Sequence, residues 1–341
     1  MTSPYEYDIA DQPRALTALL DAGLPDLTEL RDSGFERIVL TGMGSSHYGS
    51  YSSWRTLLGV CPAWWLPTSE LLDVMDVIDD TTLLWITSQS GASGEAVELL
   101  KRLDAAGTAP RAILVTTKEL DSPLAQRADV VLDLRCGEEN TVSAKSYVNT
   151  LVVHALASRQ LAGLPADDLL AEARELPGVI QSILDDPLPE AVMEALADAT
   201  SLAMIGGVSG GITAQTGALI TKESSKTVAE AYVGGAFRHG PFELAGRPEV
   251  AVVLFTGDAD YTSTSLRQLS DDLVACGTQV ITIGPQVWPG VTHVPTPATG
   301  GELTQLVTGI LRVQQLTVRL ARRAGLVPGQ FFHGGKVTST L

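Results

Sequence analysis

The sequence predicts an α/β protein built from two tandem domains, each containing a mostly parallel sheet flanked by helices. Short apolar, β-branched segments alternate with longer helical patterns, which is typical of parallel sheets that are covered on both faces. The chain has 341 residues, which is too long for one ordinary domain and suits two. The same alternation begins afresh at Ser201, so two sheets fit the pattern better than one large sheet.

Four segments of the first half have the composition of buried strands. They cover residues 37–41, 83–87, 112–116 and 129–132, and each is followed by a polar or glycine-rich turn and then a helical pattern. In the second half, segments that begin at Ser201, Val250 and Gln279 have the same character. A strand ending in glycines and followed by small polar residues occurs in both halves, at TGMGSSHYGS and IGGVSGG, which suggests a duplication.

Two prolines indicate where the first domain ends. In the run ILDDPLPEAV, Pro187 and Pro189 interrupt a helical pattern before the strand segment at Ser201. We therefore expect an N-terminal arm or helix over residues 1–24, a first domain over 25–185, a second domain over 186–325 and a C-terminal tail over 326–341.

The charge of the chain restricts its partners. A formal net charge of -17 argues against binding to nucleic acid or to an anionic membrane, because both need a surplus of Lys and Arg. A small phosphorylated metabolite remains possible, since backbone N–H groups at helix starts can bind an anion without basic side chains. The first residues lack the features of a signal peptide, and no apolar run approaches the ~20 residues that span a bilayer. We expect a cytoplasmic protein that binds a small molecule.

The cysteines and histidines predict neither a metal site nor a redox site. The three cysteines, Cys61, Cys136 and Cys276, are odd in number, widely spaced and without CxxC spacing, so they are interpreted as ordinary buried thiols. No pair of histidines has metal-ligand spacing such as HExxH. We expect no metal and no cofactor.

A glycine- and serine-rich run, GMGSS at residues 42–46, follows the first predicted strand. Glycines let the backbone approach a ligand closely, and hydroxyls at a helix start can donate to phosphate oxygens. A dinucleotide-binding fingerprint would have a third glycine where His47 stands, which argues against an NAD-dependent oxidoreductase. By itself the run is equally consistent with a simple strand-to-helix turn.

A second serine-rich run, SQSGAS at residues 88–93, follows the predicted strand at 83–87. Ligands of open parallel sheets bind beyond the carboxyl ends of the strands, so the two runs would face one crevice. Three serines and an amide ahead of a helix can hold a phosphate without a cation. A lone serine-rich turn is usually only a turn or a helix cap, but the two runs together favour a phosphate site.

Five runs spread over nearly the whole chain carry a resemblance to a known family: GMGSS, SQSGASGE, ENTVSAKSYVNTL, KESSKTVAEAYVGGAFRHGP and GGKVTSTL. With them the chain resembles the SIS-domain phosphosugar isomerases, in particular the isomerase portion of glucosamine-6-phosphate synthase and its stand-alone deaminase and deglycase relatives. The resemblance implies two tandem SIS domains with five-stranded sheets and a C-terminal tail over the active site. It also implies a homodimer whose active site lies at the subunit interface.

The resemblance further implies roles for individual residues. The residues that would bind the phosphate of a hexose 6-phosphate in the first domain are Gly44, Ser45, Ser46, Ser88, Gln89, Ser90 and Ser93. Ser143 would lie near the sugar hydroxyls. In the second domain Glu223 would shuttle a proton between C1 and C2, and His239 would assist ring opening. Lys336, in the tail, would meet the open-chain carbonyl.

The chemistry of these three last residues suits the roles. A carboxylate near C1 and C2 can take and return a proton through an enediol, and an imidazole can move protons at a hemiacetal oxygen. A lysine amine can form an iminium or stabilise an oxyanion. Each residue also has a structural interpretation: Glu223 as a solvated helix residue, His239 as a loop-packing residue and Lys336 as a solvated terminal lysine.

The chain departs from the synthase in two respects. The synthase has an N-terminal glutaminase domain with a catalytic cysteine, whereas no cysteine precedes Cys61, so we expect no glutaminase activity. Ile220 stands where the synthase has a lysine that assists proton transfer. We therefore expect an isomerase, deaminase or deglycase that acts on a hexosamine or ketosamine 6-phosphate. The alternative is a non-catalytic regulatory protein that only binds sugar phosphate.

Overall fold

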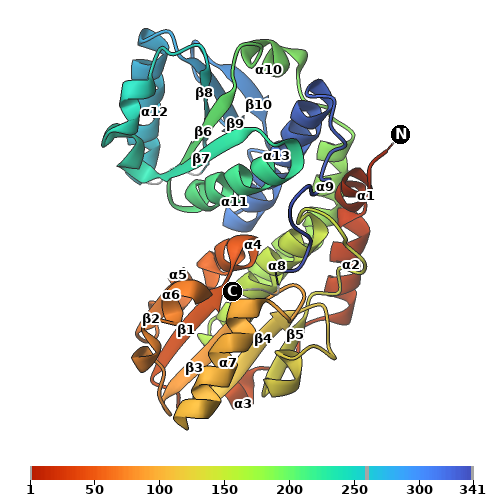
Figure 1. Ribbon diagram of the computed structural model, residues 1–341, viewed down its shortest axis with the longest axis vertical. Coiled ribbons are helices and arrows are strands. Elements are labelled where there is room, and N and C mark those ends of the chain that lie inside the picture. Colours follow the sequence, from red (N-terminus) through yellow and green to blue (C-terminus); the bar gives the residue numbers. More distant parts are fainter. Residues whose placement is uncertain (1, 258–260, 339–341) are drawn as a thin grey trace. The chain divides into compact units, whose positions relative to one another are not determined.

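The computed structural model describes residues 2–257 and 261–338, which form two compact units (Figure 1). Unit 1 comprises Met1–Pro13 and Glu175–Phe332, and unit 2 comprises Arg14–Arg174 and His333–Leu341. The chain thus leaves unit 1 near its start, returns to it within a helix, and comes back to unit 2 at its end.

Unit 2 is built on a five-stranded parallel sheet in the order β2-β1-β3-β4-β5. Its strands are β1 (Arg37–Gly42), β2 (Ala63–Pro67), β3 (Thr82–Thr87), β4 (Ala112–Thr117) and β5 (Val130–Asp133). β3 and β4 are buried along their whole length because helices cover both faces of the sheet, as their unbroken apolar character predicts.

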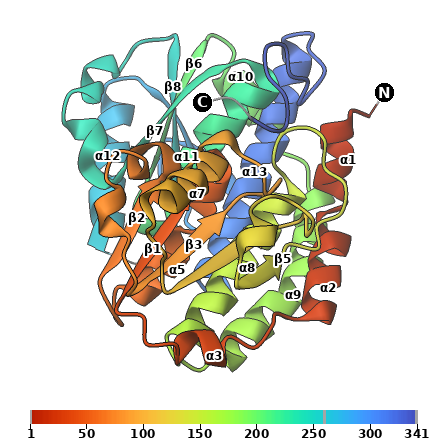
Figure 2. The same ribbon diagram turned by 60° about the horizontal axis from the view of Figure 1, so that its bottom comes forward.

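The helices of unit 2 divide between the two faces of this sheet (Figure 2). α7 (Gly94–Ala106) packs Leu99 and Leu103 against Leu84, and it ends at Gly107 in the left-handed conformation. On the opposite face α8 (Lys145–Leu161) stacks His154 on Trp85. The remaining helices are α2 (Gln12–Ala22), α3 (Thr28–Arg31), α4 (Gly44–Gly49), α5 (Tyr51–Leu57), α6 (Thr68–Leu71) and the 3₁₀ turns η1 (Met75–Val77) and η2 (Ala125–Arg127).

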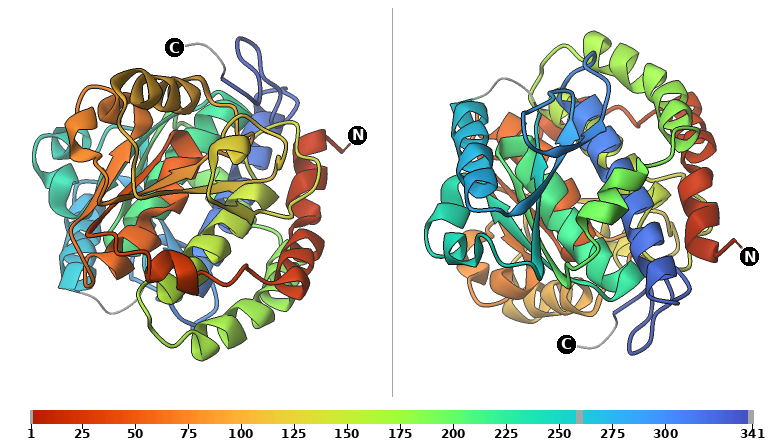
Figure 3. Two further views of the ribbon diagram at one scale, coloured as in Figure 1. Left: turned by 90° about the horizontal axis from the view of Figure 1, so that it is seen from below. Right: turned by 90° about the horizontal axis from the view of Figure 1, so that it is seen from above.

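Unit 1 contains a second five-stranded parallel sheet, in the order β10-β9-β8-β6-β7. Its strands are β6 (Ser201–Gly206), β7 (Val228–Val233), β8 (Val250–Phe255), β9 (Gln279–Gly284) and β10 (Thr292–Pro295). α12 (Tyr261–Ala275) covers one face, and α11 (Val208–Ser225) and α13 (Glu302–Arg323) cover the other (Figure 3). The unit also contains α1 (Pro4–Ala10), α10 (Glu190–Ala195), η3 (Gly234–Arg238) and η4 (Pro241–Leu244), and α9 (Asp167–Leu184) begins in unit 2 and ends in unit 1.

The two sheets have the same topology. In chain order, the first strand of each sheet lies between the second and the third, and the fourth and fifth continue outward. The pairing matches as well, since Gly42 at the end of β1 is opposite Thr87 and Gly206 at the end of β6 is opposite Phe255. This equivalence supports the duplication that the two glycine-rich runs suggest.

The predicted fold class is confirmed: the chain is α/β, with two parallel five-stranded sheets flanked by helices. The predicted strands match the central ones and the edge strand β5, whereas β2, β7 and β10 were not predicted. These three lie at sheet edges and are only partly buried; β7 and β10 include polar residues, and β2 ends in a proline. The tail over the active site and the domain ranges 1–24, 25–185, 186–325 and 326–341 stay predictions. The compact units differ from those ranges because residues 14–24 and 333–341 join unit 2.

Within the described ranges, none of the helices combines the length and apolar character needed to span a bilayer. The same residues contain no group of three or more His, Cys, Asp or Glu side chains that could hold a metal ion.

Candidate functional site

The first serine loop joins β1 to α4 in unit 2. A Cβ atom at Gly42 would lie 2.8 Å from the carbonyl oxygen of Thr87, so only glycine lets β1 and β3 end this close together. Gly44 has φ +52°, and the half-buried Ser45 and Ser46 follow it at the start of α4. The loop that follows β3 therefore begins directly beside this one.

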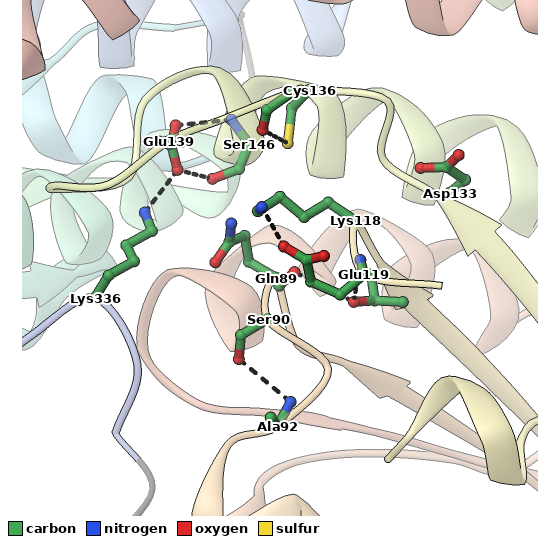
Figure 4. Close-up of polar contacts among 12 residues, drawn as sticks. Gln89, Ser90, Ala92, Lys118, Glu119, Asp133, Cys136, Glu139, Ser146 and Lys336 are labelled. Carbon is green, nitrogen blue, oxygen red and sulfur yellow. Dashed lines mark hydrogen bonds and ion pairs between the residues drawn. The ribbon is translucent and has the colours of Figure 1, made fainter. Parts of the chain in front are cut away.

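The second serine loop, residues 88–93, has a shape that depends on Gly91. Gly91 has φ +60°, and a Cβ atom there would lie 1.9 Å from the hydroxyl oxygen of Ser122. Ser88 is 4% exposed and donates its backbone N–H to the carbonyl of Thr116 at 3.0 Å. The Ser90 hydroxyl accepts the N–H of Ala92 at 3.3 Å (Figure 4). The conformation of this loop is therefore fixed by hydrogen bonds and close contacts.

Gln89 is the unusual member of this loop. Its backbone carbonyl accepts the N–H of Lys118 and the hydroxyl of Thr117, both at 3.2 Å. Its side-chain Nε2 is buried and has no hydrogen-bond partner among the described residues. Leaving a buried donor unpaired costs about 1–3 kcal/mol, so an oxygen atom of a ligand would be a favourable partner for this amide.

The loop ends at the start of α7. Ser93 is the N-cap residue, and its side chain makes no capping hydrogen bond. The N–H of Gly94, the first residue of the helix, donates to the carbonyl of Thr338 at 2.9 Å. The C-terminal segment therefore reaches the start of α7, where backbone N–H groups favour an anion.

Lys336 belongs to the same neighbourhood through Glu139, whose side chain is fully buried. Oε1 of Glu139 accepts the N–H groups of Ala144 at 2.9 Å and Ser146 at 3.1 Å, and Oε2 accepts the Ser146 hydroxyl. Nζ of Lys336 lies 2.6 Å from that Oε2 (Figure 4). It also lies 3.5 Å from the hydroxyl of Ser143. The expected residues Ser143 and Lys336 are thus brought together by a carboxylate that sequence reasoning did not assign.

Glu139 also affects a neighbouring cysteine. Burial, with a further contribution from the Glu139 carboxylate, raises the pKa of the Cys136 thiol to about 12, so this thiol is unreactive near neutral pH. The interpretation of Cys136 as a buried thiol is confirmed. For Cys276 the same interpretation was wrong, because this residue follows the last turn of α12 and is exposed.

Glu223, the expected base, lies in unit 1 near the carboxyl end of α11 and is half-buried. Lys226 caps this helix with φ 60°, and its Nζ donates to the carbonyl oxygens of Glu223 and, at 2.6 Å, of Gln330. Burial lowers the pKa of Lys226, while the charge of Glu223 acts in the opposite direction. Ile220, one turn earlier, is fully buried. Lys226 is therefore a cation beside Glu223 that the motif comparison did not single out.

His239 lies at the end of η3, next to the edge strand β7, and is exposed. Its backbone N–H donates to the carbonyl of Ala236 at 3.1 Å. Glu223 and His239 thus belong to unit 1, whereas the serine loops, Ser143 and Lys336 belong to unit 2.

His154, by contrast, is a structural residue of unit 2. Its ring is fully buried between the hydroxyls of Ser53 at 2.8 Å and Thr87 at 2.9 Å. Burial lowers its pKa to about 3, and burial likewise lowers the pKa of His47 to about 4. Both rings are therefore neutral at pH 7.

One segment of the chain matches a known family of domains, and the chain is similar to several known proteins. The model of the SIS domain family matches residues 29–159, which include both serine loops and Glu139. Glutamine–fructose-6-phosphate aminotransferase (isomerizing) of Aeropyrum pernix is 27% identical over 316 residues, which cover 86% of this chain and 50% of that protein. The enzyme of the same name from Thermus thermophilus is 29% identical over 276 residues, covering 76% and 45%. The chain spans about half the length of the curated relatives it matches.

Solved structures share the fold over almost the whole chain. The C-terminal domain of glucosamine-fructose-6-phosphate aminotransferase from Francisella tularensis has a TM-score of 0.87 at 21% identity, covering 97% of this chain and 98% of that one. Glucosamine-6-phosphate deaminase from Thermotoga maritima has a TM-score of 0.72 at 19% identity, covering 98% and 99%. Residues 29–159, with both serine loops, therefore match the SIS domain, and the chain shares its two-sheet fold with these solved structures.

Proposed function

We propose that this protein is a phosphosugar isomerase or deaminase-type enzyme that acts on a hexosamine or ketosamine 6-phosphate by proton transfer between C1 and C2. The observation that carries the proposal is the Gln89 amide, whose Nε2 is buried with no partner among the described residues, in a loop that leads into α7. Relatives named as isomerizing aminotransferases, and a structural neighbour named as a deaminase, support the class of reaction.

In this proposal the phosphate binds in unit 2 without a cation. The Gln89 amide and the hydroxyls of Ser46, Ser88, Ser90 and Ser93 donate to its oxygens, and the N-terminal end of the 13-residue helix α7 adds a favourable dipole. Gly44 and Ser45 give the ligand access to the backbone at the start of α4. The strongly negative chain can therefore bind an anion locally.

The proton is moved by unit 1. Glu223 takes a proton from one carbon of the open-chain sugar and returns it to the neighbouring carbon through an enediol or enolamine, so the carboxylate is regenerated in each cycle. His239 exchanges a proton with the ring oxygen during ring opening. The Lys226 ammonium beside Glu223 supplies positive charge that Ile220 cannot.

Lys336 is better suited to binding an oxyanion than to forming an iminium. Iminium formation requires a neutral amine that is free to attack a carbonyl. An ammonium paired with Glu139 at 2.6 Å and adjacent to Ser143 can donate its remaining hydrogens to a developing alkoxide without leaving its partner. Ser143 would then bind a sugar hydroxyl beside it.

The proposal includes a cytoplasmic homodimer in which His239 of one subunit completes the site of the other. Its exposure at the edge strand β7 is compatible with such a contact. Light scattering of the active protein measures this directly, and a monomer with full activity would contradict the dimer.

The function is tested by ligand screening followed by turnover assays. A thermal-shift screen of hexose and hexosamine 6-phosphates should identify a ligand, because a ligand at 100 times its Kd stabilises by about 2.7 kcal/mol. Ketose and ammonia assays on the hits then distinguish isomerisation from deamination. Glu223→Gln should abolish turnover and leave affinity nearly unchanged, whereas Glu230→Gln, an exposed carboxylate of the same unit, should change neither. Unchanged turnover in Glu223→Gln would show that the base is misassigned.

The second candidate function is a non-catalytic sensor of sugar phosphate. The buried Ile220, at the position where the synthase has a lysine, favours it. A sensor would bind a ligand in the thermal-shift screen, form no product from it, and bind it equally well after Glu223→Gln.

A further inference from the structure

Unit 1 has a cavity at the carboxyl end of its own sheet, the end at which unit 2 carries its serine loops. Its volume is about 50 Å³. Residues that follow β6, β8 and β9 line it, together with the first turn of α11 and one side of α13. The lining residues used below are Gly207, Ser209, Gly210, Thr256, Gly284 and Trp288.

The cavity lies at the position in unit 1 that corresponds to the two serine loops in unit 2. Thr256 is the first residue after β8, as Ser88 is the first residue after β3. The N–H of Thr256 donates to the carbonyl of Ile283 on the next strand at 2.9 Å, and the N–H of Ser88 donates to that of Thr116 at 3.0 Å. The Thr256 hydroxyl is therefore the counterpart of the Ser88 hydroxyl.

The equivalence extends to the first loop. Counting from the paired glycines that end β1 and β6, Ser209 in unit 1 corresponds to Ser45 in unit 2. Gly207 has to be a glycine, because a Cβ atom there would lie 1.7 Å from the hydroxyl oxygen of Thr262. The backbone at the start of α11 therefore lies close to the side chain of Thr262.

The Thr256 side chain is the observation that indicates a ligand. Thr256 is 3% exposed, lines the cavity, and its Oγ1 has no hydrogen-bond partner among the described residues. α11 starts at the same cavity, is 18 residues long, has no acidic residue in its first turn and receives no side-chain cap. Its first N–H groups and the unpaired hydroxyl are together suited to the oxygens of an anion.

Size and charge narrow the chemistry of the ligand. A single water molecule needs roughly 10–15 Å³ of cavity volume. A cavity of about 50 Å³ can therefore hold the oxygen atoms of one phosphoryl group but not a whole hexose. Among the described residues that line the cavity, none is charged. The carboxylate of Glu302, which is exposed, accepts the Ser209 hydroxyl at the rim.

We propose that unit 1 binds the phosphoryl group of a second phosphorylated small molecule in this cavity. The Thr256 hydroxyl and the first N–H groups of α11 donate to the phosphoryl oxygens, and the rest of the ligand projects toward solvent. This site does not depend on the function proposed for unit 2, so either can fail without the other.

Trp288 provides a site-specific probe. The chain has five tryptophans; Trp288 lines the cavity, and those at positions 54, 64, 65 and 85 belong to unit 2. The full-length protein would be labelled with 5-fluorotryptophan, and the ¹⁹F resonance of Trp288 assigned with Trp288→Phe. Titration with inorganic phosphate at constant ionic strength should move this resonance to saturation, whereas chloride should not. No movement of it at tens of millimolar phosphate would overturn the proposal.

Variants identify the groups that bind. Thr256→Val removes one hydrogen bond to a charged ligand and should raise the Kd for phosphate about tenfold or more, with no loss of thermal stability because the hydroxyl has no partner to lose. Glu302→Gln should lower the Kd, since it removes a negative charge at the rim. Thr282→Val, a control whose hydroxyl bonds to His293 at 3.0 Å, should leave the Kd unchanged and lower stability. An equal Kd in wild type and Thr256→Val would refute the assignment.

Ser88→Ala separates the two sites. It should leave the phosphate response of Trp288 intact while weakening sugar-phosphate binding in unit 2. A hexose 6-phosphate that moves the Trp288 resonance, where the unphosphorylated hexose does not, would confirm that the phosphoryl group is what unit 1 recognises. Equal shifts from both sugars would refute it.

Discussion

The ion pair between Glu139 and Lys336 should hold the C-terminal segment against unit 2, and Glu139→Gln should release it. In the native side chain Oε1 accepts two backbone N–H groups, from Ala144 and Ser146, while Oε2 accepts from Lys336 and from the Ser146 hydroxyl, which can rotate to accept from a glutamine NH₂. A glutamine oxygen can replace Oε1 and keep both backbone bonds. Its NH₂ group then replaces Oε2 and faces the Lys336 ammonium. Both groups are hydrogen-bond donors, so the bond to Lys336 is lost.

The magnitude follows from the bond that is lost. A hydrogen bond to a charged group contributes about 1.5–3 kcal/mol, and Lys336 is only 16% exposed, so screening by water is limited. A loss of about 2 kcal/mol corresponds to a roughly thirtyfold rise in the population with a detached tail. The loop at residues 139–146 should remain folded because its backbone bonds to Oε1 persist.

Amide hydrogen exchange at Gly94 measures this detachment. Its N–H donates to the carbonyl of Thr338 at 2.9 Å, so it is protected only while the tail is in place. Exchange at Gly94 should accelerate by about ten- to a hundredfold in Glu139→Gln. Lys336→Met should do the same without altering the buried loop. Glu138→Gln, the exposed neighbouring carboxylate, is the matched control. Equal Gly94 exchange in Glu139→Gln and Glu138→Gln would refute the reasoning.

Two further predictions concern unit 2. Gly91→Ala should destabilise the unit by more than the about 1–2 kcal/mol of left-handed strain, because its Cβ would also meet Ser122. Gly107 has φ +67° and no heavy atom within 4 Å of an added Cβ, so Gly107→Ala should lower the free energy of unfolding in urea only by the left-handed strain. Equal destabilisation by Gly91→Ala and Gly107→Ala would contradict the steric argument. Burial lowers the pKa of His154 to about 3 from an ordinary 6.5, so between these pH values the ring is protonated in the unfolded chain and neutral in the folded one. The free energy of unfolding should therefore fall as the pH drops from 6.5 toward 3. Between pH 6.5 and 3, His154 should lower the free energy of unfolding by about 1.4 kcal/mol per pH unit. The free energy of unfolding should therefore change less between pH 7 and pH 5 in His154→Gln than in the wild type, and an equal change would contradict the assignment.

The central strands and the serine loops could be predicted from the sequence because their information is local. A strand buried on both faces is apolar along most of its length, as in TLLWIT of β3 and VAVVLF of β8. The glycines at 42, 44 and 91 mark positions where the backbone is crowded or left-handed, and such positions exclude other residues. The edge strands β7 and β10 escaped prediction because their partly exposed positions tolerate polar residues such as Glu230 and His293.

The residues that complete each site required the tertiary structure. Glu139 and Lys336 are 197 positions apart, and no local pattern in the chain pairs a carboxylate with a lysine at that distance. In the same way, nothing in the run FTG identifies Thr256 as the counterpart of Ser88 until the two sheets have been aligned strand by strand. Sequence alone determined the α/β class and where the backbone is crowded or left-handed, since steric and hydrophobic requirements act on neighbouring residues. Which distant side chains share a site was decided by the sheet order and by the return of the chain's end to unit 2.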